Sequence, residues 1–175
     1  MKRAFFDTSV YGELIDNDTH LGLVAQKAGV RLRIFGSTTV RRELEAVPDI
    51  TLVTRGRFRG LGLRQLIVML YNQLIATGGE ISDNDLIEVL SLRYKIECSK
   101  LRTSKKDMMN DFRIVAAACM HNMRIFASAD KQQLSYEPLF REINASYQLD
   151  TPEFVPYASL ITNLKNEQEG GDSEE

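Results

Sequence analysis

Four acidic residues, far apart in the sequence, stand beside apolar runs: Asp7, Glu43, Asp111 and Asp130. Carboxylates gathered from distant segments repel one another, so such a cluster persists only when positive charge lies among them. Hard divalent cations prefer oxygen ligands. The sequence therefore makes this chain a candidate metal-dependent phosphodiester hydrolase.

The chemistry that four carboxylates could perform follows from charge. A phosphodiester repels nucleophiles, and its transition state gathers negative charge. A bound Mg²⁺ or Mn²⁺, or a pair of such ions, can lower the pKa of water, orient the water and neutralise that charge. The hydroxyls of Thr8 and Ser128 are candidates for orienting the carboxylates or binding phosphate.

Strand-like and helix-compatible segments alternate along the chain. The expected strands are 2–6, 31–36, 50–53, 124–129 and 153–155, and the expected helices are 21–28, 38–46, 61–76, 83–102, 107–122 and 138–145. This alternation predicts an α/β fold, a three-layer α/β/α sandwich around a mainly parallel central sheet. We interpret residues from about 57 to 102 as a helical insertion that Gly78 and Gly79 break into two halves.

The predicted fold gives the four acids a common position. In open α/β sheets, functional sites form outside the carboxyl ends of the strands. Asp7 and Asp130 directly follow two expected strands, whereas Glu43 and Asp111 lie in helices that would begin near the same edge. Asp107 lies one helical turn before Asp111 and could be a fifth acid at this edge.

Each acid also has a structural explanation. Asp7 could be a helix N-cap or form an Asx-turn, and Asp130 could cap the helix that follows it. Glu43 could be a solvated helix residue, and Asp111 or Asp107 could lie at a helix start. The four together, each in a suitable strand or helix context, favour a functional site.

Four short segments resemble the acidic motifs of PIN domains, in their usual order. They are Phe5–Ser9, Val40–Leu44, Asn110–Ala118 and Phe126–Asp130, and the resemblance spans nearly the whole chain. It implies a PIN-like fold and a Mg²⁺- or Mn²⁺-dependent ribonuclease, often the toxin of a toxin–antitoxin pair and often a homodimer.

The resemblance also assigns roles to individual residues. By motif match, the metal-site acids are Asp7, Glu43, Asp111 and Asp130, and the supporting hydroxyls are Thr8 or Ser9 and Ser128. The chain departs from the family over 55–106, a region longer than in the small toxins. This departure bears on the toxin role more than on the nuclease fold.

Two basic clusters could form a track for RNA. The first comprises Arg55, Arg57, Arg59 and Arg64, with Phe58 among them, and the second comprises Lys100, Arg102, Lys105 and Lys106. Contacts between such groups and phosphates give affinity without sequence information. The alternative for either cluster is ordinary solvated loop charge.

Composition indicates a single globular domain over residues 1–165, followed by an acidic segment, 166–175. Removing the five acids of that segment from the formal charge of −2 leaves a body of about +3, and the segment's composition is typical of disorder. No apolar stretch approaches the roughly 20 residues of a membrane span. Cys98 and Cys119 define no disulfide framework, so the expected compartment is the reducing cytoplasm.

Other functional classes fit the sequence less well. A haloacid-dehalogenase-like phosphatase needs a second Asp two residues after Asp7, where Ser9 stands. A Rossmann module needs a glycine-rich turn after the first strand, and none is present. The remaining alternative is a non-catalytic PIN-like scaffold that binds RNA or a protein partner. The sequence leaves open which RNA would be cleaved, whether DNA flaps are substrates, and whether an antitoxin exists.

Overall fold

The centre of the protein is a sheet of five parallel strands, seen in a computed structural model that describes residues 1–51, 60–101 and 108–169, without the side chains of 168 and 169. The strands are β1 (Lys2–Phe6), β2 (Leu32–Ser37), β3 (Gly79–Ile81), β4 (Ile125–Ser128) and β5 (Glu153–Pro156). Their order is β3-β2-β1-β4-β5, and every pairing is parallel. The expected parallel α/β fold is confirmed.

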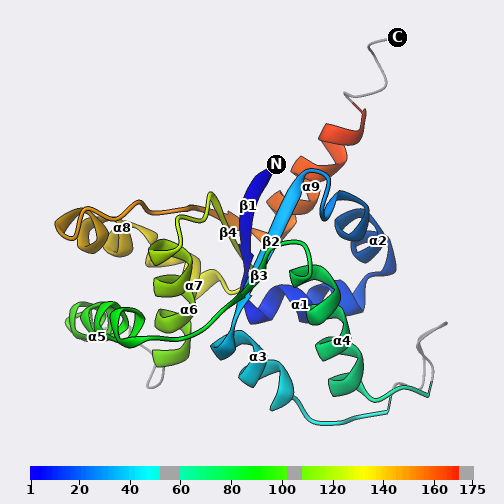
Figure 1. Cartoon of the computed structure of the whole chain (residues 1–175), viewed down its shortest axis with the longest axis horizontal. Coiled ribbons are helices and arrows are strands. Elements are labelled where there is room, and N and C mark those ends of the chain that lie inside the picture. The colour runs from blue at the N-terminus through cyan, green and yellow to red at the C-terminus, as the bar shows by residue number, and fades with distance from the viewer. Residues whose placement is uncertain (52–59, 102–107, 170–175) are drawn as a thin grey trace.

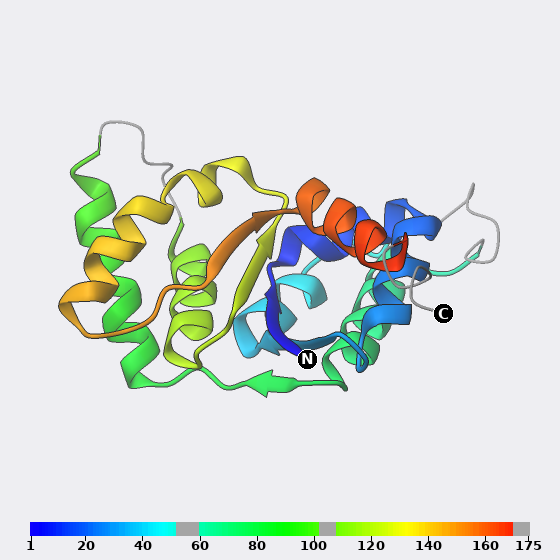
Figure 2. The ribbon, with the colours of Figure 1, turned by 90° about the horizontal axis from the view of Figure 1, so that it is seen from above.

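Helices lie on both sides of this sheet (Figures 1 and 2). One group contains α5 (Asp85–Ser99), α6 (Met109–Met120), α7 (Lys131–Ser135) and α8 (Glu137–Ser146). The other contains α1 (Thr8–Asp16), α2 (Asp18–Lys27), α4 (Leu63–Ile75) and α9 (Tyr157–Glu169). The helix α3 (Thr38–Glu45) packs against both α4 and α6. These are the three layers that the alternation of elements predicts.

The middle strands form because their side chains are apolar on both faces. Ala4, Phe5 and Phe6 of β1 are fully buried, as expected for a parallel sheet covered by helices on each side. The ring of Phe5 stacks on that of Phe126 in the neighbouring β4, with 6.0 Å between centroids. The core therefore fixes β1 and β4 side by side, and it holds in place the residues that come directly after these strands.

The region from 57 to 102 is not the purely helical insertion that the sequence predicts. Its residues Gly79–Ile81 form β3, which pairs with β2 and adds an edge strand to the central sheet. A Cβ at Gly78 would lie 2.3 Å from the Ile34 carbonyl oxygen, and Gly79 has a φ of +123°. The two glycines allow a close backbone approach and a left-handed conformation. The two glycines therefore allow β3 to pair with β2, and do not merely separate two helices.

Other boundaries also differ from expectation. The expected strand 50–53 is wrong at its described start, where Thr51 makes only an isolated bridge to Gly62, and 52–53 lie outside the described residues. The expected helices did not include α1, α7 or α9, although the structural explanations of Asp7 and Asp130 as N-caps anticipated the starts of α1 and α7. Because α9 continues through Glu169, residues 166–169 are helical and not disordered, whereas 170–175 lie outside the described residues.

Apolar packing explains why α9 extends into the acidic segment. Its residues Leu160, Ile161 and Leu164 are buried, and they follow a helical spacing. The acidic residues of the segment suggest disorder, because composition alone does not reveal the buried apolar stripe that precedes them in the same helix.

Within the described part of the chain, no helix is long and apolar enough to cross a membrane.

Candidate active site

The order of the strands defines one crevice at the carboxyl edge of the sheet. β1 lies between β2 and β4, so the chain leaves β1 toward one side and later returns on the other. Ligands bind outside the carboxyl ends of strands at such a reversal. Asp7 follows β1 at this point, and its N–H donates to Ala127 O of β4 at 3.0 Å. The first predicted acid therefore lies at the site that the topology favours.

The carboxylate of Asp7 is buried and held by two hydroxyls. Its Oδ2 accepts hydrogen bonds from Ser9 Oγ at 2.6 Å and from Ser128 Oγ at 3.1 Å. It also accepts from the Ser9 backbone N–H at 3.3 Å, which makes Asp7 the N-cap of α1. The capping explanation and a functional role are therefore compatible. The second oxygen, Oδ1, accepts from neither hydroxyl.

Burial makes the negative charge of Asp7 costly. Desolvation raises the pKa of Asp7 above its ordinary value of 3.8, and the hydrogen bonds from Ser9 and Ser128 offset this rise only in part. Neutral hydroxyls orient the carboxylate without cancelling its charge. A cation at this position would therefore stabilise the ionised form.

Glu43 is tied to the same edge from the β2 side. Ser37 closes β2 and caps α3 by accepting from the Val40 N–H at 3.3 Å. One turn further along α3, Glu43 accepts a short hydrogen bond from Thr8 Oγ1. Thr8 is the residue after Asp7, so this hydroxyl connects the second acid to the first.

Asp130 is tied to the edge from the β4 side. Its N–H donates to Ser128 Oγ at 3.0 Å, and the preceding Ala129 N–H donates to Ser9 Oγ at 2.9 Å. The carboxylate of Asp130 accepts from the backbone N–H groups of Gln132 and Gln133, so it also caps α7. The three predicted hydroxyls thus connect three of the four predicted acids.

Asp111 lies on a different helix from the other three predicted acids. It lies half-buried in the first turn of α6, which packs against α3. Because α6 leads into the amino end of β4, its own first turn lies toward the carboxyl edge. Asp107 lies outside the described residues.

The acids share an edge without gathering around a point. Among the described residues, no three Asp, Glu, His or Cys side chains are grouped so that they could hold a metal ion directly. The observed hydrogen bonds explain the spread, because Asp7, Glu43 and Asp130 each turn an oxygen toward a hydroxyl or a helix start. Convergence of all four acids on one cation stays a prediction.

The donor chemistry nevertheless fits a hard divalent cation. Within the described ranges, no Lys or Arg forms an ion pair with Asp7, Glu43 or Asp130. The local ligands are all oxygens, which Mg²⁺ and Mn²⁺ prefer. Mg²⁺ usually keeps several waters and needs only one or two carboxylates, so a spread arrangement of acids is compatible with it.

Two residues at this edge were missed by the sequence analysis. The Tyr11 hydroxyl is buried without a hydrogen-bond partner among the described residues, and burial together with the charge of Asp7 raises the Tyr11 pKa. Asp83 follows β3, and its Oδ2 accepts from Thr39 Oγ1 at 2.9 Å and from Arg42, whereas its buried Oδ1 has no partner there. Tyr11 could have been found from its position four residues after Asp7. Asp83 could not, because β3 was not predicted.

The expected basic track lies mostly outside the described part of the chain. Arg55, Arg57, Arg59, Arg102, Lys105 and Lys106 fall in the ranges that the structure does not describe. Arg64 is described, lies in the first turn of α4, and forms an exposed ion pair with Asp49 at 3.5 Å. Lys100 pairs with Glu97 at 2.7 Å. These two ion pairs favour the solvated explanation for the described members of both clusters.

Comparison with known proteins identifies the fold. No protein-family model matches the sequence, and no curated protein matches it. Among solved structures, a chain of VapBC-1 from nontypeable Haemophilus influenzae matches with a TM-score of 0.56 and 12% identity, over 89% of this chain and 98% of the other. A chain of DNA-bound VapBC from Salmonella typhimurium gives 0.57 and 11%, over 90% and 99%. A chain of VapBC2 from Rickettsia felis, bound to a promoter DNA fragment, gives 0.52 and 13%, over 88% and 98%.

The protein therefore has the PIN-domain fold, as the sequence resemblance predicts. At 11–13% identity, the likeness to these chains defines the architecture. The chain spans nearly the full length of each matched chain.

Proposed function

We propose that this protein is a divalent-metal-dependent ribonuclease of the PIN type that hydrolyses phosphodiester bonds in RNA. The observation that carries the proposal is the state of Asp7. Its carboxylate is buried at the carboxyl edge of β1, its pKa is raised, and no cationic side chain of the described residues pairs with it. A protein retains such a costly anion when a ligand, here a cation, compensates the charge.

In this proposal Asp7 is the principal metal ligand, with Glu43, Asp111 and Asp130 contributing directly or through water. The bound ion would lower the pKa of a water molecule and neutralise the charge that develops on the phosphate. Ser9 and Ser128 orient Asp7 by donating to its Oδ2, which leaves Oδ1 free of these two hydroxyls. Thr8 holds Glu43 by its hydroxyl. Carboxylates oriented in this way bind metal more tightly than free ones.

The shared fold also supports a biological role. Three of the chains that match this protein come from VapBC structures, two of them bound to DNA. We propose on this basis that the protein acts as a toxin whose activity a partner protein, an antitoxin, restrains. The homodimer that the sequence resemblance implies stays a prediction.

The rival function is a PIN-like scaffold that binds RNA or protein without hydrolysis. The two functions differ in their need for metal, because a scaffold needs no cation beside Asp7, whose carboxylate would then serve only as the N-cap of α1. A scaffold should therefore bind Mn²⁺ weakly and should bind RNA equally well with and without it.

The test is incubation of the purified protein with total cellular RNA, with Mn²⁺, with Mg²⁺ and with chelator, followed by mapping of new 5′ and 3′ ends. We expect discrete new ends that require the metal and vanish in Asp7→Asn. The matched control is Asp16→Asn, at the last residue of α1. Identical ends with Asp7→Asn and wild type would contradict the proposal and favour the scaffold.

A further inference from the structure

Three arginines lie side by side at the edge of the sheet opposite the acids. Arg3 in β1 is the register partner of Arg33 in β2. Arg124 directly precedes β4, and its backbone N–H donates to Arg3 O at 2.9 Å. All three are exposed. Since Asp7 comes four positions after Arg3, the two edges are about 13 Å apart along the strand.

Among the described residues, no carboxylate lies within ion-pair distance of these three arginines, in contrast to most other described arginines. Arginines with an acid within ion-pair distance include Arg41, Arg42, Arg64, Arg93, Arg113 and Arg141. Within the ranges that the structure describes, Arg3, Arg33 and Arg124 have no such partner. The acids Asp150 and Glu153 line the same cavity as Arg124 but do not reach ion-pair distance from it.

One member of the row is anchored structurally, and the other two are not. Arg3 donates to His121 O at the end of α6 at 2.8 Å, and its guanidinium lies 4.6 Å from the centre of the Phe35 ring. The side chains of Arg33 and Arg124 form no hydrogen bond with any described residue. Anchoring fixes the position of Arg3 without cancelling its charge. The remaining two guanidinium groups keep their donors for a ligand.

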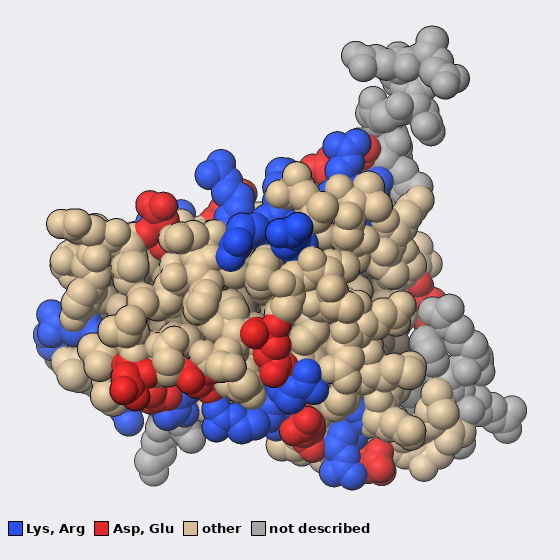
Figure 3. Space-filling model, in the orientation of Figure 1, with Lys and Arg blue, Asp and Glu red and all other residues tan. Residues whose placement is uncertain are grey.

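Like charges on adjacent strands destabilise a sheet. The charge of Arg3 also acts on a neighbour, because the pKa of His121 is lowered first by burial and then by Arg3. Figure 3 shows Lys and Arg side chains gathered over the start of β1 and β2, on the face that is turned to the viewer. A row that costs stability and lacks internal compensation is a candidate binding surface for an anion.

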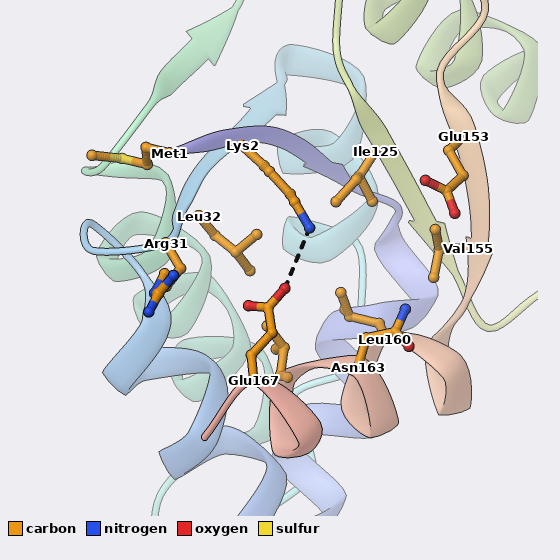
Figure 4. A pocket seen from close by; sticks show the side chains of 11 residues that line it. Met1, Lys2, Arg31, Leu32, Ile125, Glu153, Val155, Leu160, Asn163 and Glu167 are labelled. Atoms are coloured by element: carbon orange, nitrogen blue, oxygen red, sulfur yellow. Dashed lines mark hydrogen bonds and ion pairs between the residues drawn. The ribbon is translucent and has the colours of Figure 1, made fainter. Parts of the chain in front are cut away.

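The other side of the same edge does not share this property. There a cavity of about 270 Å³ lies between the sheet and α9. In Figure 4 the Lys2 amino group points to the Glu167 carboxylate, which is 3.3 Å away. Charge on this side is thus partly compensated. The row of Arg33, Arg3 and Arg124 has no such ion pair among the described residues.

We propose that Arg33, Arg3 and Arg124 form a binding surface for the phosphodiester backbone of a nucleic-acid strand, separate from the acidic edge. Neighbouring strands are about 4.8 Å apart, so the row extends over roughly 10 Å. Consecutive phosphates of one strand of a duplex rise by about 3.4 Å, so the row can meet two or three of them. Guanidinium groups suit phosphate because their donors are paired and planar. The inference concerns binding and stands whether or not the acidic edge hydrolyses RNA.

The test measures binding of a fluorescent single-stranded RNA, and of DNA of the same sequence, by anisotropy across a salt series. Chelator is present throughout, so metal-dependent binding and hydrolysis at the acidic edge do not contribute. The variant is Arg33→Gln with Arg124→Gln, which spares the anchored Arg3. The matched control is Arg93→Gln with Lys95→Gln, which removes the same charge from exposed positions on α5.

We expect the variant to weaken binding and to reduce the slope of log K against log salt by about 1.4, or 0.7 for each lost contact on a single strand. The control should leave the slope unchanged. Equal changes in variant and control would overturn the proposal, because net charge alone would then explain binding. Displacement of RNA by polyglutamate of equal charge, at equal concentration, would also overturn it in favour of an acidic polypeptide partner. The RNA and DNA arms distinguish the two nucleic acids.

Stability provides a second measurement. If the arginines repel one another, Arg33→Gln with Arg124→Gln should melt no lower than wild type, so lost binding cannot be attributed to unfolding. If the protein fails to hydrolyse RNA but still binds RNA in chelator through these arginines, the proposed ribonuclease function is wrong and this inference stands.

Discussion

Ser128 Oγ donates a hydrogen bond to the buried Oδ2 of Asp7 at 3.1 Å and joins the ends of β4 and β1. The two residues are 121 positions apart in the sequence. The same hydroxyl accepts from the Asp130 N–H at 3.0 Å. One side chain therefore orients one predicted metal ligand and the backbone of another.

Replacement of Ser128 by Ala should therefore lower both stability and activity. Asp7 would keep its buried charge with one donor fewer, and hydrogen bonds to charged groups contribute about 1.5–3 kcal/mol. We expect the free energy of unfolding, measured by urea denaturation without metal, to fall by about this amount. Ser135→Ala removes an exposed hydroxyl that bonds only to Gln132 O, and it should have a much smaller effect. Equal losses in the two variants would contradict the role of Ser128.

Asp7→Asn should stabilise the metal-free protein at neutral pH while abolishing hydrolysis. The substitution removes a desolvated charge and keeps an acceptor for Ser9 and Ser128. Each kcal/mol relieved should raise the Tm by about 2–4 °C in a chain of this size. The measurement is a thermal melt in chelator, with Asp16→Asn as control. A lower Tm for Asp7→Asn would show that its charge is not a source of strain.

The stability gained by Asp7→Asn should depend on pH in a defined direction. The folded pKa of Asp7 lies above the ordinary value of 3.8, so the native state holds this proton more tightly than the unfolded state. This contribution is fully present below 3.8 and is lost as the pH rises through the folded pKa. Urea denaturation of wild type and variant at several pH values should show a difference that grows over that window and then levels off. A difference that shrinks with rising pH would refute the sign.

Thr8→Val should weaken metal binding without removing a predicted ligand. Its hydroxyl holds Glu43, and loss of a residue that orients a metal ligand usually costs 10- to 100-fold in affinity or activity. The measurement is Mn²⁺ affinity by calorimetry. Thr162→Val is the control. The exposed Thr162 hydroxyl donates to Ala158 O, within the same helix α9. Unchanged Mn²⁺ affinity in Thr8→Val would separate Glu43 from the metal site.

Gly78→Ala should destabilise the protein by about 1–3 kcal/mol or more, because the new Cβ would lie 2.3 Å from the Ile34 carbonyl oxygen. Gly22→Ala is the matched control. Gly22 lies inside α2 with nothing within 4 Å of a Cβ, so alanine should stabilise by about 0.4–1 kcal/mol. Urea denaturation measures both. A neutral Gly78→Ala would mean that β3 does not dock as the structure describes.

The sequence by itself determined the features that depend on local pattern. The apolar residues that end Lys2–Phe6 indicate a strand that is buried on both faces there, and Ser37 caps α3 because its hydroxyl precedes a helical stretch. Alternation of such elements predicts a parallel α/β sheet, and in such a sheet Asp7 and Asp130 each follow a strand at the carboxyl edge. Fold class and the identity of the candidate acids were therefore accessible without coordinates.

Tertiary structure alone decided the features that depend on contacts between distant segments. Gly79–Ile81 is too short and polar to show strand periodicity, and only pairing with β2 makes it β3. The row of Arg33, Arg3 and Arg124 exists only because β1 lies between β2 and β4. The burial that raises the pKa of Asp7 comes from packing of the whole core, and a local sequence pattern does not predict that packing. Local sequence sets the backbone preference of each segment. Strand register and burial, which depend on distant segments, set which charged side chains become neighbours and how far their pKa values shift.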